Sequence, residues 1–329
     1  MYIFINYLRV LAAILITNSH YGQIWPVADL AAGGLIGNIL FFAISGFCLY
    51  QIKENFVKYF GKRIVRIYPL VVVFTLFTVL IGDFAINGFN DIVRFFIYPT
   101  NYIFIVWLMV AYALFYIVAY LSKKYNKFME ITFVSLIVAW LLTYLIFVDK
   151  NFYHIDNVNE PFILFLYFIS MLMGALFRKH QTKVEKGKLY LYIILLPISL
   201  LIYFGSKIVF SKVSKVAPLQ FLNQISILIV LYLIFALFIL LESKLKTFPN
   251  KLNKIIKFIS GLTLHIYVVQ FVVIRRLQHL TFPLNLITVS IGIIALAIVV
   301  YYIEQFIRKS IISLTRKANK EDNNAKSID

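Results

Sequence analysis

Two ionisable residues lie in the first apolar run of the chain, where their side chains could do chemistry inside a membrane. Arg9 and His20 are eleven residues apart. At about 100° per residue, an α-helix returns over that distance to within roughly 20° of the same face, with a rise of about 16 Å. A guanidinium suits the binding of an anion, and an imidazole, whose unperturbed pKa is about 6.5, suits proton transfer. The plainer alternatives are that Arg9 extends to the cytoplasmic headgroups and that His20 is an interfacial residue.

A second candidate group is basic. Lys62, Arg63 and Arg66 fall in the connection expected between the second and third apolar runs. Guanidinium groups bind phosphate through paired hydrogen bonds, so these residues could hold a phosphorylated ligand. Lys and Arg are also typical of the cytoplasmic loops of membrane proteins, and the local sequence by itself favours that interpretation.

Polar residues in the second apolar run could line a cavity beside the first. Asn38 and Ser45 are seven residues apart and therefore share one helix face. The preceding glycines, in Gly-Gly-Leu-Ile-Gly-Asn at 33–38, indicate close helix packing. Ser45 is a poor candidate for a nucleophile, because a Gly-x-Ser-x-Gly turn is absent and no acid is evident that would orient a histidine base.

The other histidines and the single cysteine suggest less. His265 lies in a late apolar run and is a weaker second candidate for proton transfer. His154 and His279 fall in expected outer connections and His180 in a cytoplasmic one, and no pair has metal-ligand spacing, so we expect no metal site. Cys48 cannot form an internal disulfide, and we expect it to serve in packing.

The composition of the chain indicates whether these residues lie in a soluble domain or in a membrane. The 329 residues are 62% hydrophobic and 14% charged, whereas a soluble domain is about half apolar and a quarter charged. The net charge of +18 would suit nucleic acid only if it formed a soluble basic face. Here the basic residues lie in short connections between apolar runs, where they record membrane orientation and attraction to lipid headgroups. We therefore expect membrane lipids, and not nucleic acid, as partners.

The apolar runs predict an all-α, polytopic membrane bundle of about ten transmembrane helices. We expect the first run to be retained as a span, and we find no internal repeat. One membrane domain is expected over residues 1–316, followed by a polar, disordered tail over 317–329. The predicted spans are 2–20, 31–50, 67–86, 101–121, 131–148, 161–177, 189–206, 219–241, 258–276 and 285–307.

The distribution of Lys and Arg tests these spans. Of the 32 basic residues, 24 lie in the connections after even-numbered spans or in the tail, and seven lie in the opposite connections. Arg9, inside the first span, is the remaining one. Because cytoplasmic loops carry the excess of Lys and Arg, this alternation places both ends of the chain in the cytoplasm.

Three motifs in order resemble the membrane acyltransferase-three family. The first is Arg9 with His20, the second is Phe-Phe-Ala-Ile-Ser-Gly-Phe at 41–47, and the third is Arg-Ile-Val-Arg-Ile-Tyr-Pro-Leu at 63–70. The resemblance continues more faintly in later spans and so covers most of the chain. The later matching residues are Trp107, Tyr116 and Tyr267.

Three positions depart from the family pattern. Asn6 stands where many members have Asp, Tyr112 where many have Glu, and Gln270 where many have His. A mechanism that needs a second acid or base at these positions is therefore not expected here, and the departures suggest a branch with its own acceptor.

The resemblance implies an enzyme with about ten spans that moves acetyl or another acyl group from cytoplasmic acyl-CoA to a cell-surface carbohydrate. It implies catalytic roles for His20 and Arg9, and donor binding by Lys62 and the two neighbouring arginines. Acetyl-CoA would be a donor substrate, with no permanently bound cofactor. The residues expected to line the cavity are Asn38, Ser45, Trp107, Tyr116, Tyr267 and Gln270.

The leading hypothesis is thus an O-acyltransferase in a bacterial cytoplasmic membrane, acting on a surface polysaccharide or its lipid-linked precursor. A transporter or flippase for an envelope glycan or small molecule is the alternative, since intramembrane Arg and His also suit a substrate or proton pathway. Many transporters contain internal repeats, which this sequence lacks. A structural subunit of a polysaccharide assembly complex is a third possibility.

Overall fold

The computed structural model describes residues 2–99 and 102–325, and side chains as far as Ser310. The first residue of the predicted span 101–121 and the last four of the predicted tail lie outside the described residues. Within them, every regular element is a helix. The long helices are α1 (Ile3–Ser19), α2 (Gly34–Leu49), α3 (Phe56–Leu80), α5 (Ile103–Lys124), α6 (Phe128–Phe147), α7 (Ile163–Lys179), α9 (Leu189–Lys212), α10 (Phe221–Leu240), α12 (Asn250–Leu277) and α13 (Leu284–Ala325). Short elements are η1 (Ala28–Leu30), α4 (Phe89–Ile92), η2 (Val93–Ile97), α8 (Gln181–Val184), η4 (Ser214–Leu219) and α11 (Glu242–Lys246).

Each predicted span overlaps one long helix. In the described part of the chain, eight helical segments are long and apolar enough to cross a membrane. The helices α1 and α7 have 17 residues each, the lower end of the range that crosses a hydrocarbon core. The structure therefore confirms an all-α, multi-pass membrane bundle, and the number ten stays a prediction.

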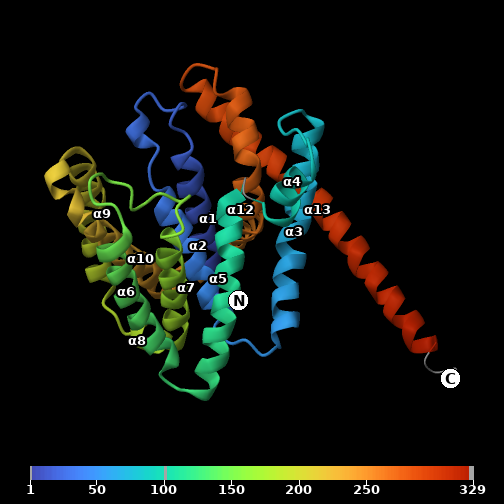
Figure 1. Cartoon of the computed structure of the whole chain (residues 1–329), viewed down its shortest axis with the longest axis horizontal. Coiled ribbons are helices and arrows are strands. Elements are labelled where there is room, and N and C mark those ends of the chain that lie inside the picture. The colour runs from blue at the N-terminus through green and yellow to red at the C-terminus, as the bar shows by residue number, and fades with distance from the viewer. Residues whose placement is uncertain (1, 100–101, 326–329) are drawn as a thin grey trace.

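The connections alternate between two ends of the bundle (Figure 1). The turn joining α5 to α6 and the short helix α8 lie at the lower end of the view, and the α1–α2 and α12–α13 connections lie at the upper end. The helices α2 and α7 are largely buried, whereas α6 and α9 bury only three residues each and expose long apolar side chains. Exposed apolar surface of this kind is what lipid contact requires.

Two contacts distant in sequence fix the start of α1. The Glu242 carboxylate accepts hydrogen bonds from Ile3 N at 3.2 Å and Phe4 N at 2.8 Å, satisfying amide groups that a helix start leaves unpaired. Ser260 Oγ on α12 donates to Asn6 Oδ1 at 3.0 Å. Asn6 thus joins α1 to α12, and both contacts hold the helix that carries Arg9.

The third long helix begins earlier than its predicted span. Asn55 caps α3, because its Oδ1 accepts from Lys58 N at 3.0 Å, and the helix runs on from Phe56 without interruption. The basic residues expected in a connection therefore lie on the first turns of α3. Helical geometry, rather than a loop, sets their directions.

The last helix also extends beyond its predicted span. Helical backbone in α13 continues to Ala325, past Lys317, where the sequence analysis expected disorder, and its second half projects away from the bundle (Figure 1). The proposed domain boundary at residue 316 stays a prediction.

Topology mapping with reporter fusions should place residues 53–66 and the chain after Arg308 in the cytoplasm, and residues 149–161 outside. The reason is the excess of basic residues in the first two segments. A reporter that places residues 179–188 outside would contradict the orientation, because it breaks the alternation from which the orientation follows.

Candidate active site

A small inner cavity brings three arginines together. Arg9 comes from α1, and Arg63 and Arg66 come from α3. None of the described residues that line the cavity is acidic, so the positive charge is available to an anion. The cavity holds about 100 Å³, too little for a nucleotide, so a large ligand must keep its bulk on the side where α1 and α3 begin. Ser45, Cys48 and Tyr112 also line it.

Aromatic rings and not carboxylates hold Arg63 in place. Its guanidinium carbon lies 4.9 Å from the centre of the Tyr59 ring and 5.8 Å from that of Tyr112. The Nε atom is buried and has no hydrogen-bond partner among the described residues. Cation–π contact orients the group, and the Nε–H donor remains available to a ligand.

Two residues of the second predicted span, Ser45 and Cys48, line this cavity. Ser45 Oγ lies 3.3 Å from the hydroxyl of Tyr112, another lining residue. Cys48, expected to be packing, is exposed and lines the same cavity. Helical periodicity directs it to the arginine side, away from the packed face of α2.

A larger outer cavity of about 800 Å³ contains His20, and its volume is within the range of small-molecule sites. His20 follows the last residue of α1 and is exposed. Its ring packs edge-on against Phe271, with ring centres 4.6 Å apart, and no described residue hydrogen-bonds it. The imidazole is therefore accessible to a ligand in this cavity.

Three residues line both cavities and so form the wall between them. They are Ile16 of α1, Phe104 of α5 and Tyr267 of α12. The Phe104 and Tyr267 rings pack with centres 5.2 Å apart. Arg9 and His20 thus lie in neighbouring cavities that share these three lining residues.

Other predicted lining residues of the outer cavity are held by hydrogen bonds. Asn38 Nδ2 donates to Tyr167 Oη at 3.0 Å, and Trp107 Nε1 donates to the Val158 carbonyl at 3.0 Å. Both residues line the outer cavity with Tyr267. The Asn38 contact joins α2 to α7, and the Trp107 contact joins α5 to the loop that precedes α7.

Three predicted site residues line neither cavity. Lys62 is exposed and forms an ion pair with Glu54, and this hydrogen-bonded pair holds the pKa of Glu54 below its ordinary value. Tyr116 Oη donates to the Glu54 carbonyl at 3.3 Å. Gln270 is fully buried, and its amide has no hydrogen-bond partner among the described residues. Tyr116 and Gln270 lie on the helices expected, whereas Lys62, expected in a connection, lies on α3.

The second histidine candidate also lies apart from both cavities. His265 is buried between α12 and α13, and its Nε2 lies 3.7 Å from Glu304 Oε2. The ring packs edge-on against Tyr301 at 5.3 Å between centres. The structure thus distinguishes His20, which is accessible, from His265, which is enclosed.

Sequence reasoning missed several outer-cavity residues, notably Asp156, Tyr203 and Lys207. One signal was present, because Lys207, Lys212 and Lys215 fall in an outer connection, against the general bias of the basic residues. Spacing could not have shown that the first of these faces Asp156.

Comparison with known proteins identifies the family to which this chain belongs. A family model described as an acyltransferase domain, of the acyltransferase-3 type, matches residues 2–304. The chain belongs to the acyltransferase-3 family. Searches of curated proteins and of solved structures returned no match. The matched residues include both cavities and the long helices from α1 to α12, together with the first half of α13, and this chain is accordingly a multi-pass membrane acyltransferase.

Arg63→Ala and Arg66→Ala should weaken the use of acyl-CoA, and Arg9→Lys should do so too because an ammonium lacks the planar fork. A lost charge-assisted hydrogen bond costs about 1.5–3 kcal/mol, which is roughly a 10- to 150-fold rise in KM for acyl-CoA. Initial rates over a range of acetyl-CoA concentrations measure this.

Lys62→Ala is the matched control, since Lys62 is adjacent in sequence but faces Glu54 and lines neither cavity. We expect its KM for acetyl-CoA to stay within about twofold of the parent's. Equal effects of Lys62→Ala and Arg63→Ala would show that general surface charge, and not the inner cavity, binds the donor.

Proposed function

We propose that this protein is an acyl-CoA-dependent O-acyltransferase, with acetyl-CoA as the donor, that modifies a hydroxyl of a cell-surface polysaccharide or its lipid-linked precursor at the bacterial cytoplasmic membrane. The supporting observation is the pair of abutting cavities, one containing three arginines and the other His20, with only three side chains in common. A reaction between a phosphorylated donor on one side and a hydroxyl acceptor on the other requires such an arrangement.

The donor would bind across the wall. The CoA phosphates meet the arginines at the inner cavity, and the pantetheine arm extends past Tyr267 to bring the thioester near His20. The helical rise of about 16 Å from Arg9 to His20 is comparable to the length of that extended arm. Because the donor is held on both sides of the wall, binding energy at the phosphates positions the carbonyl carbon for attack.

The chemistry then needs one base. The His20 imidazole accepts the proton of the acceptor hydroxyl as its oxygen bonds to the thioester carbonyl carbon. The carbon–sulfur bond breaks, the acyl group remains on the acceptor oxygen as an ester, and the CoA sulfur leaves with the proton that His20 accepted. A thioester is activated enough for attack without an additional acid.

The outer cavity has the composition of a sugar site. Rings of Trp107, Tyr203 and Phe204 line it together with Asn38 and Asn159. Aromatic faces pack against the apolar faces of sugars, and amide groups hydrogen-bond their hydroxyls. A polyhydroxylated acceptor entering from the upper end of the bundle in Figure 1 would meet His20 there.

The direct test supplies radiolabelled acetyl-CoA to purified protein in lipid nanodiscs together with polyprenyl-diphosphate-linked sugars. We expect label on a sugar hydroxyl, removable by mild base as an ester would be. Translocation of the sugar without label in the product would favour a transporter instead. Release of CoA with no labelled glycan would show that the acceptor belongs to another chemical class.

A further inference from the structure

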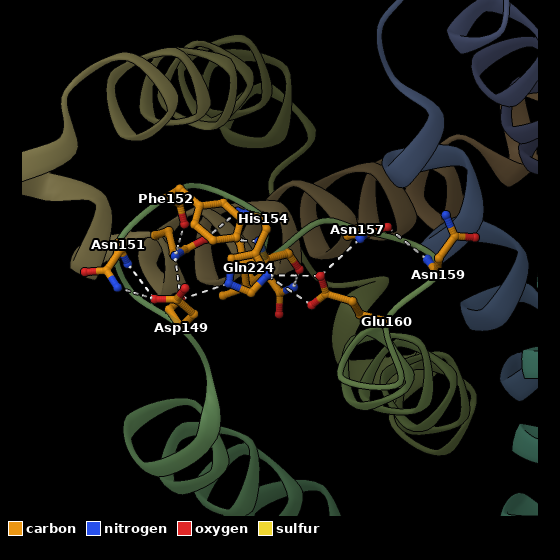
Figure 2. A network of polar contacts seen from close by, with 10 residues as sticks. Asp149, Asn151, Phe152, His154, Asn157, Asn159, Glu160 and Gln224 are labelled. Carbon is orange, nitrogen blue, oxygen red and sulfur yellow. Dashed lines mark hydrogen bonds and ion pairs between the residues drawn. The ribbon is translucent and has the colours of Figure 1, made fainter.

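The loop between α6 and α7 is held rigidly against α10 by two buried glutamines (Figure 2). Gln220 Oε1 accepts from His154 N at 2.9 Å and from Ile155 N at 3.0 Å, and its Nε2 donates to the Phe152 carbonyl at 3.0 Å. Gln224 Nε2 donates to the Ile155 carbonyl at 2.6 Å. Both glutamines are at most 1% exposed. The two glutamine side chains thus form hydrogen bonds with N–H and C=O groups of the loop backbone, and these bonds hold the loop in this conformation.

Further contacts close the loop upon itself. His154 lies across it, with Nδ1 3.0 Å from the Glu160 carboxylate and Nε2 2.8 Å from the Asp149 carbonyl. Trp107 binds the Val158 carbonyl from α5. Contacts with α5 and α10, and contacts within the loop, thus help to position residues 156–159 at the outer cavity.

Asp156 on this loop forms an ion pair with Lys207 of α9, and both residues line the outer cavity. The Asp156 side chain is 17% exposed and that of Lys207 44% exposed. A partly exposed ion pair contributes little to stability, and the loop is already held by its other contacts. What the pair supplies is a carboxylate acceptor and an ammonium donor side by side, beside the rings of Tyr203 and Phe204.

We infer that Asp156 and Lys207 recognise the acceptor and that the loop over residues 149–160 thereby sets which acceptor is acylated; this inference rests on the proposed function. The ligand chemistry is a sugar whose neighbouring oxygens donate to the carboxylate and accept from the ammonium. Gln220 and Gln224 are positioning residues, which hold the carboxylate at its place in the cavity.

The test compares Asp156→Asn and Lys207→Met with the parent in nanodiscs, using acetyl-CoA and the polyprenyl-diphosphate sugar that the parent labels fastest. We expect KM for the sugar to rise about tenfold or more, with KM for acetyl-CoA unchanged. Asp83→Asn is the matched control: Asp83 is also 17% exposed, pairs with Arg275 and Arg276, and does not line the outer cavity. Its kinetics should equal those of the parent.

A double reversal, Asp156→Lys with Lys207→Asp, separates recognition from support of the fold. It restores the ion pair while exchanging the positions of donor and acceptor, so thermal stability should equal the parent's and KM for the sugar should stay high. Recovery of KM by the double variant, or unchanged KM in both single variants, would overturn the inference while leaving the proposed function intact. A parent protein that labels no sugar would overturn the proposed function and this inference with it.

Discussion

His20→Gln should abolish acyl transfer while leaving acyl-CoA binding and the amount of folded protein nearly unchanged. Glutamine retains hydrogen-bonding groups but cannot accept a proton near neutral pH, and loss of a general base lowers turnover by about 10²- to 10⁴-fold. The side chain is exposed in the outer cavity, where its ring packs on Phe271, so the substitution leaves little packing defect. Labelled acetyl transfer and acetyl-CoA binding, measured on the same preparation, test both halves of this expectation.

His265→Gln is the matched control, because His265 lies in the α12–α13 interface and lines neither cavity. The fraction of the His265→Gln protein that folds should retain acyl transfer activity. Substantial acylation by His20→Ala would refute His20 as the base and make His265 the next residue to test. An acyl group trapped on His20 would instead reveal a covalent histidine intermediate in place of direct transfer.

Gly46→Ala and Gly174→Ala should each prevent stable folding, because the backbones of α2 and α7 touch at these glycines. A Cβ at Gly46 would lie 1.7 Å from the Met171 carbonyl oxygen, and one at Gly174 would lie 1.8 Å from that of Ala43. Backbone atoms cannot rotate away as a side chain can, so the helices must separate. Overpacking of this severity costs about 3 kcal/mol or more, which thermal unfolding in detergent would report as a large drop in melting temperature.

Gly61→Ala gives the contrasting result expected of an unobstructed helical glycine. Nothing lies within 4 Å of a Cβ at Gly61 on α3, and Ala is favoured over Gly in a helix by about 0.5–1 kcal/mol. Its melting temperature should equal or exceed the parent's. Similar melting of all three variants would mean that α2 and α7 do not pack as closely as described.

The two glycines also explain part of a sequence motif. Gly46 lies in the Phe-Phe-Ala-Ile-Ser-Gly-Phe segment at 41–47, whose resemblance to the family first suggested a site. In the structure, Gly46 lies where α2 contacts α7. Phe42 stacks on Tyr167 with ring centres 4.5 Å apart. Of Phe42, Ser45 and Gly46, only Ser45 lines the inner cavity. The motif is thus mainly a packing device that brings the cavity walls together.

Much of this protein follows from the order of its residues. Long apolar runs require lipid and helices, since no other structure satisfies so much backbone in hydrocarbon. Helical periodicity places Arg9 and His20 on one face at different depths, and the motif set predicted the family that the comparison shows. These properties depend on residues close together in the chain, whose relative positions the helix itself determines.

Tertiary structure decided which polar residues face one another. Periodicity gives the face of each residue on its own helix but not the neighbour opposite, so Lys62, Tyr116 and Gln270 were expected at the site and lie outside both cavities. Asp156 and Lys207 are 51 residues apart in the chain, and only the folded loop brings them together. Such a pairing depends on how α9, α10 and the loop pack, and a single sequence carries no local signal of that packing.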